Sequence, residues 1–484
     1  MQYKWVALTV TTVGTLMYAI DDRILVIGLP TLAREIGANV TEAIWVTQAY
    51  VLAATISLLL IGRLADVAGR VKLYNIGFII FTIGSGLAAI SFTPAELIAS
   101  RLVQGLGASA IAANGLAILT DATPENELGT FIGYNQVAFR SGTVMGLVLS
   151  GVLLSITSWR ALFYINIPIG IFGTLWAHYR LKEVSKINRA NISRKIDWQG
   201  FATVTSGLTL VLLAITFFSY GSSDYSVSSV ILGLGAVLLI AFMFIERRKV
   251  VPLLDLKLLK IRVVGGGMVA AMLSAITWNG MLYMISIYMQ VVLGFTPLQA
   301  GLGVLPLEGC LLFVGPLAGR ISDRWKSPLF PTIGLLFFAI SCFYEAILFN
   351  VSTTYLVVAF ALVLVALGQG IFTSPNLRII MSSVPAGNRG VTNSFRQTLY
   401  NIGDTTGPVL SITLITLGIP YHVFTSLLQS TIGTGLALEV ARQEFVSGYK
   451  LTALVLGVVS LVAIVPSSLR SRKKDSSNLE KLDS

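Results

Sequence analysis

The sequence contains few charged residues, few cysteines and few histidines. Asp, Glu, Lys and Arg make up 12% of its 484 residues, whereas about 25% is typical of soluble proteins. Hydrophobic residues account for 55% of the chain, and only a lipid bilayer solvates that much apolar surface. The composition therefore excludes an ordinary soluble enzyme and predicts a membrane protein.

The scarce residue types also exclude several kinds of chemistry. The two cysteines, Cys310 and Cys342, lie in apolar runs and provide neither a disulfide framework nor a metal site. The two histidines, His178 and His422, are too few for haem or zinc chemistry. The sequence has no glycine loop of the Walker type, no nucleophile triad and no cluster of metal ligands. We therefore expect a protein that is not an enzyme and that binds neither a metal nor a cofactor.

Long apolar segments dominate what the sequence does contain. A helix that spans a bilayer needs about 20 apolar residues. Fourteen segments of about this length lie near residues 5–28, 43–62, 73–92, 95–118, 130–155, 161–179, 201–219, 228–245, 265–292, 299–318, 330–349, 354–374, 390–417 and 448–466. This pattern predicts an all-α fold of fourteen transmembrane helices in a lipid bilayer.

The 34 Lys and Arg residues indicate how these helices are oriented. With the N-terminus inside, 26 of them fall in inner segments, four in outer loops and four within helices. An excess of basic residues on one side is typical of cytoplasmic loops. We therefore expect a multi-pass protein of the cell membrane with both termini in the cytoplasm. The basic residues of the cytoplasmic loops then account for the net charge of +11, so we expect no nucleic-acid partner.

The two halves of the chain contain related sequences. Gly62-Arg63-Leu64-Ala65-Asp66 recurs as Gly319-Arg320-Ile321-Ser322-Asp323, at an offset of 257 residues. A second set, at an offset of 261, is Leu106, Gly107, Pro124, Gly129, Gly142, Gly146 and Ser150, which recur as Leu367, Gly368, Pro385, Gly390, Gly403, Gly407 and Ser411. Parallel repeats of this kind are a transporter architecture. The predicted parts are a six-helix half (1–182), two inserted helices (183–262), a second six-helix half (263–468) and a basic tail (469–484).

The first repeated block belongs to a short loop rich in glycine and charge. Residues 62–72 read Gly-Arg-Leu-Ala-Asp-Val-Ala-Gly-Arg-Val-Lys. Glycines allow a tight turn, and Asp66 can interact with the positive end of the next helix. This loop and its copy at 319–324 resemble the signature loop of the major facilitator superfamily. The resemblance implies a conformational latch formed by Gly62, Asp66, Gly69, Arg70, Gly319, Asp323 and Arg324. The alternative is a basic anchor with a tight turn.

Two helices carry further motifs that resemble those of the same family. Arg101 followed by Gln104-Gly105-Leu106-Gly107 resembles its second motif, whose arginine is linked to proton transfer. Gly142, Gly146 and Gly151 resemble the glycine-rich stretch of its antiporter branches, although Leu147 replaces the proline there. The copy in the second half contains Gly403, Gly407 and Pro408. Close helix packing is the main role expected of these residues.

Two segments resemble a narrower branch, the 14-spanner drug:proton antiporter family. They are Trp159-Arg160-Ala161-Leu162-Phe163-Tyr164-Ile165-Asn166-Ile167-Pro168-Ile169-Gly170 and Ile20-Asp21-Asp22-Arg23-Ile24-Leu25-Val26-Ile27-Gly28-Leu29-Pro30. That family usually has a hydroxyl residue in place of Arg23 and an asparagine in place of Val26. Because Arg23 is a cation beside the expected proton site, it could repel the lipophilic cations that this family often exports.

Charged residues at membrane depth cost roughly 2.5–3.5 kcal/mol each, so they indicate function or pairing. At about 1.5 Å per residue, Asp21 lies roughly 24 Å above Trp5, which is near the inner edge. In a core about 30 Å thick, Asp21 is therefore about 6 Å below the outer edge. Arg101 lies about 9 Å from the outer end of its helix by the same rise. These depths match and predict an Asp21–Arg101 ion pair, which can take up a proton when it breaks. Asp22 points about 100° away from Asp21 and is expected to pair with Arg23, although either acid could face the cavity.

Other polar residues at membrane depth are candidates for substrate or proton binding. Glu308 lies roughly 16 Å along its helix from Gly319 and is expected to carry a proton or to bind a cationic substrate, with a purely structural role as the alternative. Asp404 needs a partner, for which Arg140 is one candidate. Glu345 is expected near the outer surface as an interfacial residue. Further candidates for the cavity wall are Arg23, Tyr50, Gln104, Asn279, Tyr283, Gln290 and Asn393.

Together these features predict a proton-coupled secondary transporter that exports drugs or other lipophilic small molecules by alternating access. We expect it to act as a monomer, with protons and a small-molecule substrate as its partners, and with the outer loop 420–447 resting on the membrane or capping the vestibule. The alternative is a proton symporter or uniporter of an anionic or polar metabolite, which Arg23, Arg140 and the altered glycine motif favour. A receptor or scaffold that has kept the fold without transport is a third interpretation.

Overall fold

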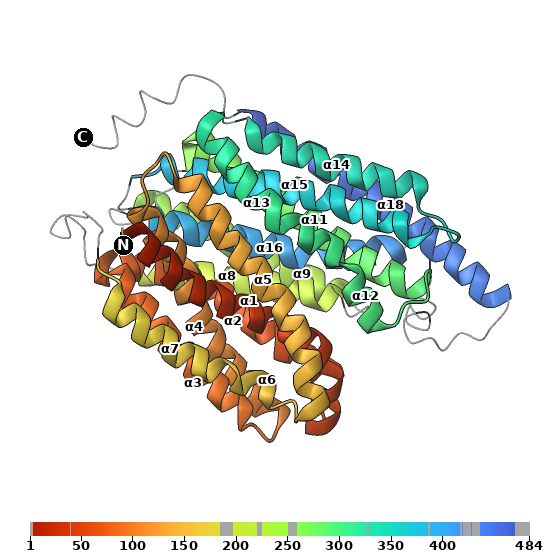
Figure 1. The fold of residues 1–484 in the computed structure, drawn as a ribbon, viewed down its shortest axis with the longest axis horizontal. Coiled ribbons are helices and arrows are strands. Elements are labelled where there is room, and N and C mark those ends of the chain that lie inside the picture. The colour runs from red at the N-terminus through yellow and green to blue at the C-terminus, as the bar shows by residue number, and fades with distance from the viewer. Residues whose placement is uncertain are drawn as a thin grey trace. The chain divides into compact units, whose positions relative to one another are not determined.

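The computed structural model describes most of the chain as helices. The described residues are 3–38, 40–183, 197–219, 225–249, 259–325, 327, 329–385, 388–416, 419, 427 and 436–469. Within these ranges no strand occurs, as expected for an all-α membrane protein (Figure 1). The predicted basic tail lies almost entirely outside the described residues, as does much of the predicted outer loop 420–447.

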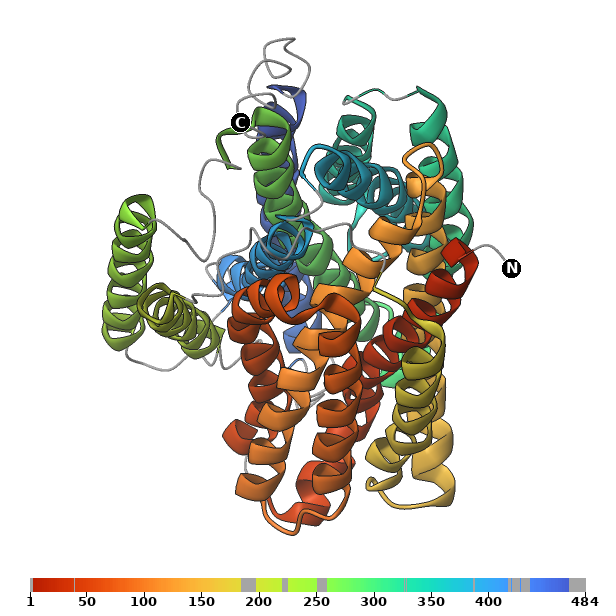
Figure 2. The ribbon, with the colours of Figure 1, turned by 90° about the vertical axis from the view of Figure 1, so that its left-hand side faces the viewer.

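The chain forms two compact units, which are described separately. The first comprises Met1–Thr209, Val237–Leu256 and Met381–Thr398. Its complete helices are α1 (Tyr3–Ile36), α2 (Val40–Ala68), α3 (Arg70–Ala89), α4 (Pro94–Ala122), α5 (Leu128–Ile156), α6 (Ala161–Tyr164) and α7 (Asn166–Arg180). Within this unit α4 packs against α2 and α3, which lie beside it (Figure 2), and α1 packs against α5.

The second unit comprises Leu210–Ala236, Lys257–Ile380 and Leu399–Ser484. Its helices are α11 (Arg262–Val291), α12 (Pro297–Gly303), α13 (Leu305–Trp325), α14 (Phe330–Leu348), nearly all of α15 (Tyr355–Ser382), and α18 (Leu436–Ser468). Besides α15, whose last two residues belong to the first unit, three helices contribute residues to both units: α8 (Trp198–Ser219), α9 (Tyr225–Arg248) and α16 (Arg389–Thr416). Within the second unit α18 packs against α11 and α14.

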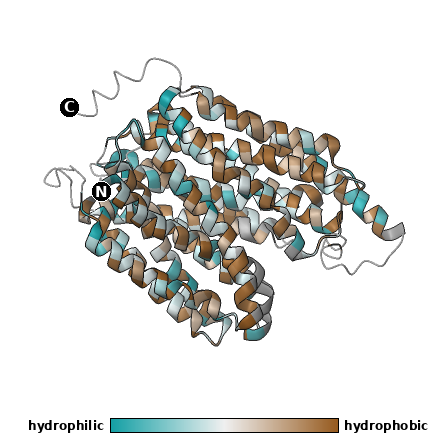
Figure 3. Ribbon diagram, viewed as in Figure 1, coloured by the Kyte–Doolittle hydropathy of each residue, from teal (hydrophilic) through white to brown (hydrophobic). Residues whose placement is uncertain are grey.

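Each of the fourteen predicted segments overlaps an observed helix or a pair of consecutive short helices. Hydrophobic residues dominate the long helices (Figure 3). Among the described residues, ten helical stretches are long and apolar enough to cross a membrane. The fold is therefore that of a multi-pass helical membrane protein, while the number of fourteen spans and the division into halves at residues 182, 262 and 468 stay predictions.

Local sequence explains where several helices begin and break. Thr93 caps α4 by accepting a hydrogen bond from the Glu96 amide, and the Glu96 carboxylate accepts from the Thr93 amide in return. Gly69 precedes α3 with φ 109°, in the left-handed region that favours glycine. The helix breaks between α6 and α7 just before Pro168, whose ring nitrogen has no hydrogen to donate to the preceding turn.

Glycines bring α5 into close contact with α1. A Cβ atom at Gly142 would lie 2.8 Å from the Ala19 Cβ, and one at Gly146 would lie 2.7 Å from the Ile20 carbonyl oxygen. Gly403 and Gly407 contact the backbone of α11 in the same way, and Pro408 follows them within α16. Gly151 also lies on α5. The backbone contacts of α5 adjoin residue 21, so glycine packing helps to hold that part of α1 in place.

Gly146→Ala should therefore destabilise the protein. The added methyl group meets backbone rather than a flexible side chain, so we expect a loss of about 1–3 kcal/mol, as for other overpacked sites. Gly233→Ala is the matched control, because a Cβ at this α9 position would have no neighbour within 4 Å among the described residues. Thermal unfolding of both variants in detergent measures the difference. Equal midpoints for the two variants would contradict the packing role of Gly146.

Candidate functional site

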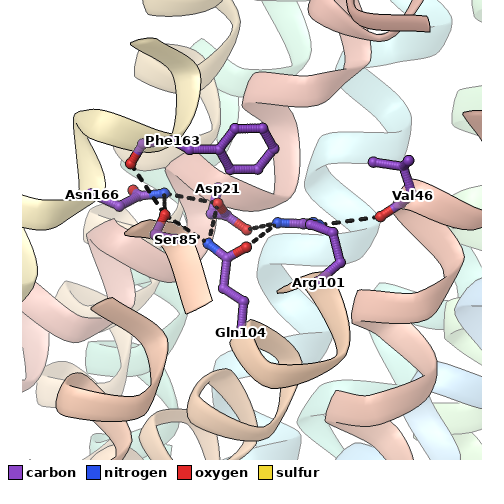
Figure 4. Close-up of polar contacts among 7 residues, drawn as sticks. All are labelled: Asp21, Val46, Ser85, Arg101, Gln104, Phe163 and Asn166. Atoms are coloured by element: carbon purple, nitrogen blue, oxygen red, sulfur yellow. Dashed lines mark hydrogen bonds and ion pairs between the residues drawn. The ribbon is translucent and has the colours of Figure 1, made fainter. Parts of the chain in front are cut away.

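A buried carboxylate, Asp21 of α1, lies at the centre of a polar network in the first unit (Figure 4). Its exposed fraction is 0%. Arg101 Nη1 on α4 lies 2.7 Å from Asp21 Oδ2, which is the ion pair predicted from the helical rise. Arg101 is itself only 2% exposed. The pair is thus removed from solvent on both sides, where an unpaired charge would be costly.

Neutral side chains complete the coordination of Asp21. Gln104 Nε2 and Asn166 Nδ2 each donate a hydrogen bond of 2.8 Å to Asp21 Oδ1. Both amides also lie 3.1 Å from Ser85 Oγ on α3, and the Ser85 hydroxyl donates to the Phe163 carbonyl oxygen. Figure 4 shows these residues converging from α1, α3, α4, α6 and α7. The carboxylate therefore has donors on both oxygens.

Arg101 has acceptors other than Asp21. Its Nε donates to the Val46 carbonyl oxygen of α2 at 3.2 Å, and its Nη1 donates to Gln104 Oε1 at 2.6 Å. The guanidinium carbon lies 4.2 Å from the centroid of the Tyr50 ring, within the range of a cation–π interaction. If Asp21 were neutralised by a proton, Arg101 would keep these interactions. Arg101 therefore keeps two hydrogen bonds and one ring contact when the charge pair is lost.

Asp22 and Arg23 form a separate pair beside this network. Arg23 Nε lies 3.2 Å from Asp22 Oδ2, and the two side chains are 31% and 29% exposed, respectively. Asp21 rather than Asp22 thus occupies the buried position. This agrees with the expectation that the two neighbouring acids point in different directions.

The predicted cavity residues fall in both units. Tyr50 lies beneath Arg101, and among the described residues its hydroxyl group has no hydrogen-bond partner. Arg140 lies on α5, with its guanidinium 5.4 Å from the Phe139 ring centroid. Asn393 of α16 also belongs to the first unit, where its Nδ2 donates to the Ala113 carbonyl oxygen at 3.3 Å. The candidates of the second unit are Asn279, Tyr283 and Gln290 on α11, Glu308 on α13 and Asp404 on α16. Asn279 and Glu308 are buried.

The predicted latch loop is tied to α4 by an ion pair. Arg70, the first residue of α3, pairs with Asp121 near the end of α4, and Arg389 Nη1 of α16 lies 3.6 Å from the other oxygen of Asp121. A Cβ at Gly62 would meet the Ser394 side chain. These contacts lie within the first unit. The side chain of Asp66 lies outside the described residues.

The copy of this loop in the second unit is tied to its neighbour with the charges reversed. Asp323 Oδ1 on α13 accepts from Arg378 Nε on α15 at 2.8 Å, and both side chains are largely buried. Gly319 and Arg324 lie on the same helix. Arg378 thus corresponds to Asp121 in position, because the two residues are 257 residues apart, the same offset as the first repeated block, although they carry opposite charges.

Sequence reasoning missed several residues of these clusters. Asn166 occurs in a segment that resembles a known family, yet its contact with Asp21 depends on the break between α6 and α7. Ser85 and Asp121 carry no motif signal of their own. The interpretation of Glu345 as an interfacial residue is wrong: it is 1% exposed, because α18 and α15 cover it.

Comparisons with known proteins agree with this architecture. The sequence model of the Major Facilitator Superfamily matches residues 11–408. The chain is 31% identical over 425 residues to the riboflavin transporter RibZ of Clostridioides difficile, covering 87% of this chain and 90% of the relative. It is 26% identical over 409 residues to the tetracenomycin C resistance and export protein of Streptomyces glaucescens, covering 83% and 74%. The human organic anion transporter MFSD10 has a similar fold, with a TM-score of 0.68 at 15% identity, over 96% of this chain and 99% of that one.

The two charges of the buried pair should not be equally costly to leave alone. Arg101→Met leaves Asp21 with only neutral donors, so we expect a loss of about 3–5 kcal/mol, as for other broken buried pairs. Asp21→Asn should cost less, because Arg101 retains Val46, Gln104 and the Tyr50 ring. Thermal unfolding of both variants in detergent measures this difference. An equal or larger loss in Asp21→Asn would contradict the alternative contacts of Arg101.

Proposed function

The chain belongs to the major facilitator superfamily, and we propose that it is a proton-coupled transporter that exports drugs or other lipophilic small molecules. Its family and its transporter relatives make it a multi-pass membrane transporter. The finer proposal covers alternating access, location in the cell membrane with cytoplasmic termini, and action as a monomer. The observation that carries proton coupling is the buried Asp21–Arg101 pair.

This pair supports proton coupling because Arg101 has hydrogen-bond acceptors other than Asp21. A proton on Asp21 cancels the charge that holds Arg101, while the Gln104 and Asn166 amides remain close to the carboxyl group. Arg101 then relies on the Val46 carbonyl, the Gln104 side chain and the Tyr50 ring. Loading and release of a proton thus alternate with breaking and forming one ion pair. Each proton that enters supplies about 2.3 kcal/mol per 100 mV, enough for roughly a fiftyfold substrate gradient.

The proposed substrate-binding residues are polar side chains of both units. In the first unit they are Arg23, Tyr50, Gln104 and Arg140, and in the second unit Asn279, Tyr283 and Asp404, with Glu308 as a further proton or cation site. The Tyr50 hydroxyl is the best supported, because it is buried and has no hydrogen-bond partner among the described residues. A buried polar group of this kind is usually satisfied by a partner. The export protein for tetracenomycin C supports a drug-like substrate.

We assign a latch function to the charges around Asp121. Arg70 and Arg389 approach this one carboxylate from α3 and from the first turn of α16. Gly62 allows the close approach of Ser394, which lies five residues after Arg389 on α16. A state in which the start of α16 separates from α4 would lose the Arg389 contact. The proposed latch therefore stabilises the state in which these segments are in contact.

A second candidate function is the transport of riboflavin or another polar metabolite. The riboflavin transporter RibZ is 31% identical over 87% of this chain. The partly exposed Arg23 beside the proton network also favours a substrate that is not a cation. The two candidates differ in the compound that drives proton movement, which makes them experimentally separable.

Asp21→Asn should abolish substrate-driven proton movement. The test uses inside-out vesicles with an acid interior and a pH-sensitive dye, to which lipophilic cations, organic anions and riboflavin are added in turn. Asp22→Asn is the matched control, because Asp22 forms a separate, partly exposed pair, and it should keep the response. Counterflow of labelled substrate checks that the Asp21→Asn protein still binds and exchanges its substrate.

The outcomes of this experiment separate the proposals. Dequenching by cations that disappears in Asp21→Asn supports drug:proton antiport. A response to riboflavin or anions alone favours the second candidate function. Full proton movement in Asp21→Asn would overturn the assignment of Asp21, and an absence of counterflow with every compound would overturn transport of these substrate classes.

Asp121→Asn should weaken the latch. In a variant without the two free cysteines, Cys310 and Cys342, a cysteine introduced as Ser394→Cys reports opening, because Ser394 is fully buried. Loss of about 1.4 kcal/mol from the closed state raises the labelling rate by a membrane-impermeant maleimide about tenfold. The exposed Glu125→Gln is the matched control. Identical labelling rates in Asp121→Asn and Glu125→Gln would contradict the latch.

A further inference from the structure

Glu345 is a buried acid that the proton network of the first unit does not use. It lies on α14, within one turn of the helix end at Leu348, and is 1% exposed. Around it are the apolar and aromatic residues Cys342, Phe349, Tyr288 and Tyr449 of the second unit's core. An ionised carboxylate in such surroundings needs strong compensation.

The compensation available to Glu345 is unlike that of Asp21. The Tyr449 hydroxyl of α18 lies 2.6 Å from Glu345 Oε2, and Ser341 Oγ lies 3.3 Å from Oε1. Within the described ranges no cationic side chain pairs with Glu345. Two neutral hydroxyl groups are thus the polar contacts of this carboxyl group, whereas Asp21 has a guanidinium and two amides.

The other titratable groups near Glu345 bring no positive charge. Cys342 and Tyr344 precede it on α14, and Tyr449 faces it from α18. On α11, the Tyr288 ring lies 5.1 Å from the Tyr449 ring. On α15, the Ala361 carbonyl oxygen accepts a hydrogen bond from Ser341. Tyrosine and cysteine are either neutral or negative, so none of these groups balances an ionised Glu345.

The hydrogen atoms at the site can be counted. Ser341 Oγ lies within hydrogen-bond distance of both Glu345 Oε1 and the Ala361 carbonyl oxygen, at 3.3 and 3.1 Å. A serine hydroxyl has only one hydrogen to donate, so an ionised Glu345 and the carbonyl would compete for it. A proton on Oε1 removes this conflict: Glu345 donates to Ser341, Ser341 donates to Ala361, and Tyr449 donates to Oε2. Every donor then has one acceptor.

We propose that Glu345 is a proton-binding site, occupied at neutral pH and held by Ser341 and Tyr449. The ligand is the proton itself, carried on Oε1 and donated to the Ser341 hydroxyl. Because Glu345 bridges α14 and α18 through Tyr449, loss of this proton places an uncompensated charge at that helix contact. The site lies in a different unit from Asp21 and stands independently of the proposed export function.

Infrared spectroscopy of the full-length protein in lipid nanodiscs tests this proposal. The difference spectrum between the natural protein and Glu345→Gln at neutral pH should contain the carbonyl stretch of one neutral carboxyl group. Tyr449→Phe should shift that band to higher frequency, because the carboxyl group loses a hydrogen bond. Glu444→Gln, which removes an exposed acid on α18, is the matched control and should show only the bands of an ionised carboxylate.

Two results would overturn the proposal. One is a Glu345→Gln difference spectrum with carboxylate bands and no neutral carboxyl band at neutral pH. The other applies if Glu345→Gln fails to fold: the Tyr449→Phe spectrum would then shift a carboxylate band rather than a neutral one. Neither readout requires transport, so failure here is distinguishable from failure of the proposed export function.

Discussion

The desolvation of one ion pair constrains the whole first unit. Asp21 and Arg101 are both buried, and a buried pair is tolerated only when hydrogen bonds satisfy its remaining atoms. Those bonds come from Gln104, Asn166 and the Val46 carbonyl, and Ser85 accepts from the two side-chain amides in turn. Helices α1, α2, α3, α4 and α7 must therefore meet at one place. Close glycine contacts between helices make this possible. For example, a Cβ at Gly84 of α3 would lie only 2.6 Å from the backbone nitrogen of Gln104 on α4. Helix packing and charge stabilisation are therefore a single requirement.

The repeated loops show that the two units meet a similar structural need with opposite charges. In the first unit a base at the start of α3 pairs with an acid on α4, as Arg70 with Asp121. In the second unit an acid near the end of α13 pairs with a base on α15, as Asp323 with Arg378. The glycine and aspartate of the loop recur in the sequence, and the partner position recurs at the same offset of 257, but with an acid, Asp121, in the first unit and a base, Arg378, in the second. Both units therefore have a buried ion pair that holds the loop against the fourth helix of the predicted half.

Asp21 and Glu345 represent two ways of keeping a carboxyl group away from water. Asp21 has a cation with alternative acceptors nearby, which allows the acid to be ionised. Glu345 has only hydroxyl partners among the described residues, which favours the neutral acid. The cost of an unpaired charge in an apolar environment decides both cases. The partner residues, rather than the depth of the acid, thus determine which form of the carboxyl group is stable.

The sequence by itself determined the helices and the depth of the main ion pair. A bilayer requires every backbone polar group to be satisfied within the segment, so long apolar runs become helices, and a constant rise per residue relates Asp21 to Arg101. The tertiary structure alone decided that Asn166 binds Asp21 and that Ser85 binds Asn166, that Asp121 pairs with Arg70, and that Glu345 is buried rather than interfacial. The physical reason is that periodicity places a residue along its own helix axis, whereas its partners depend on which other helices pack against that face.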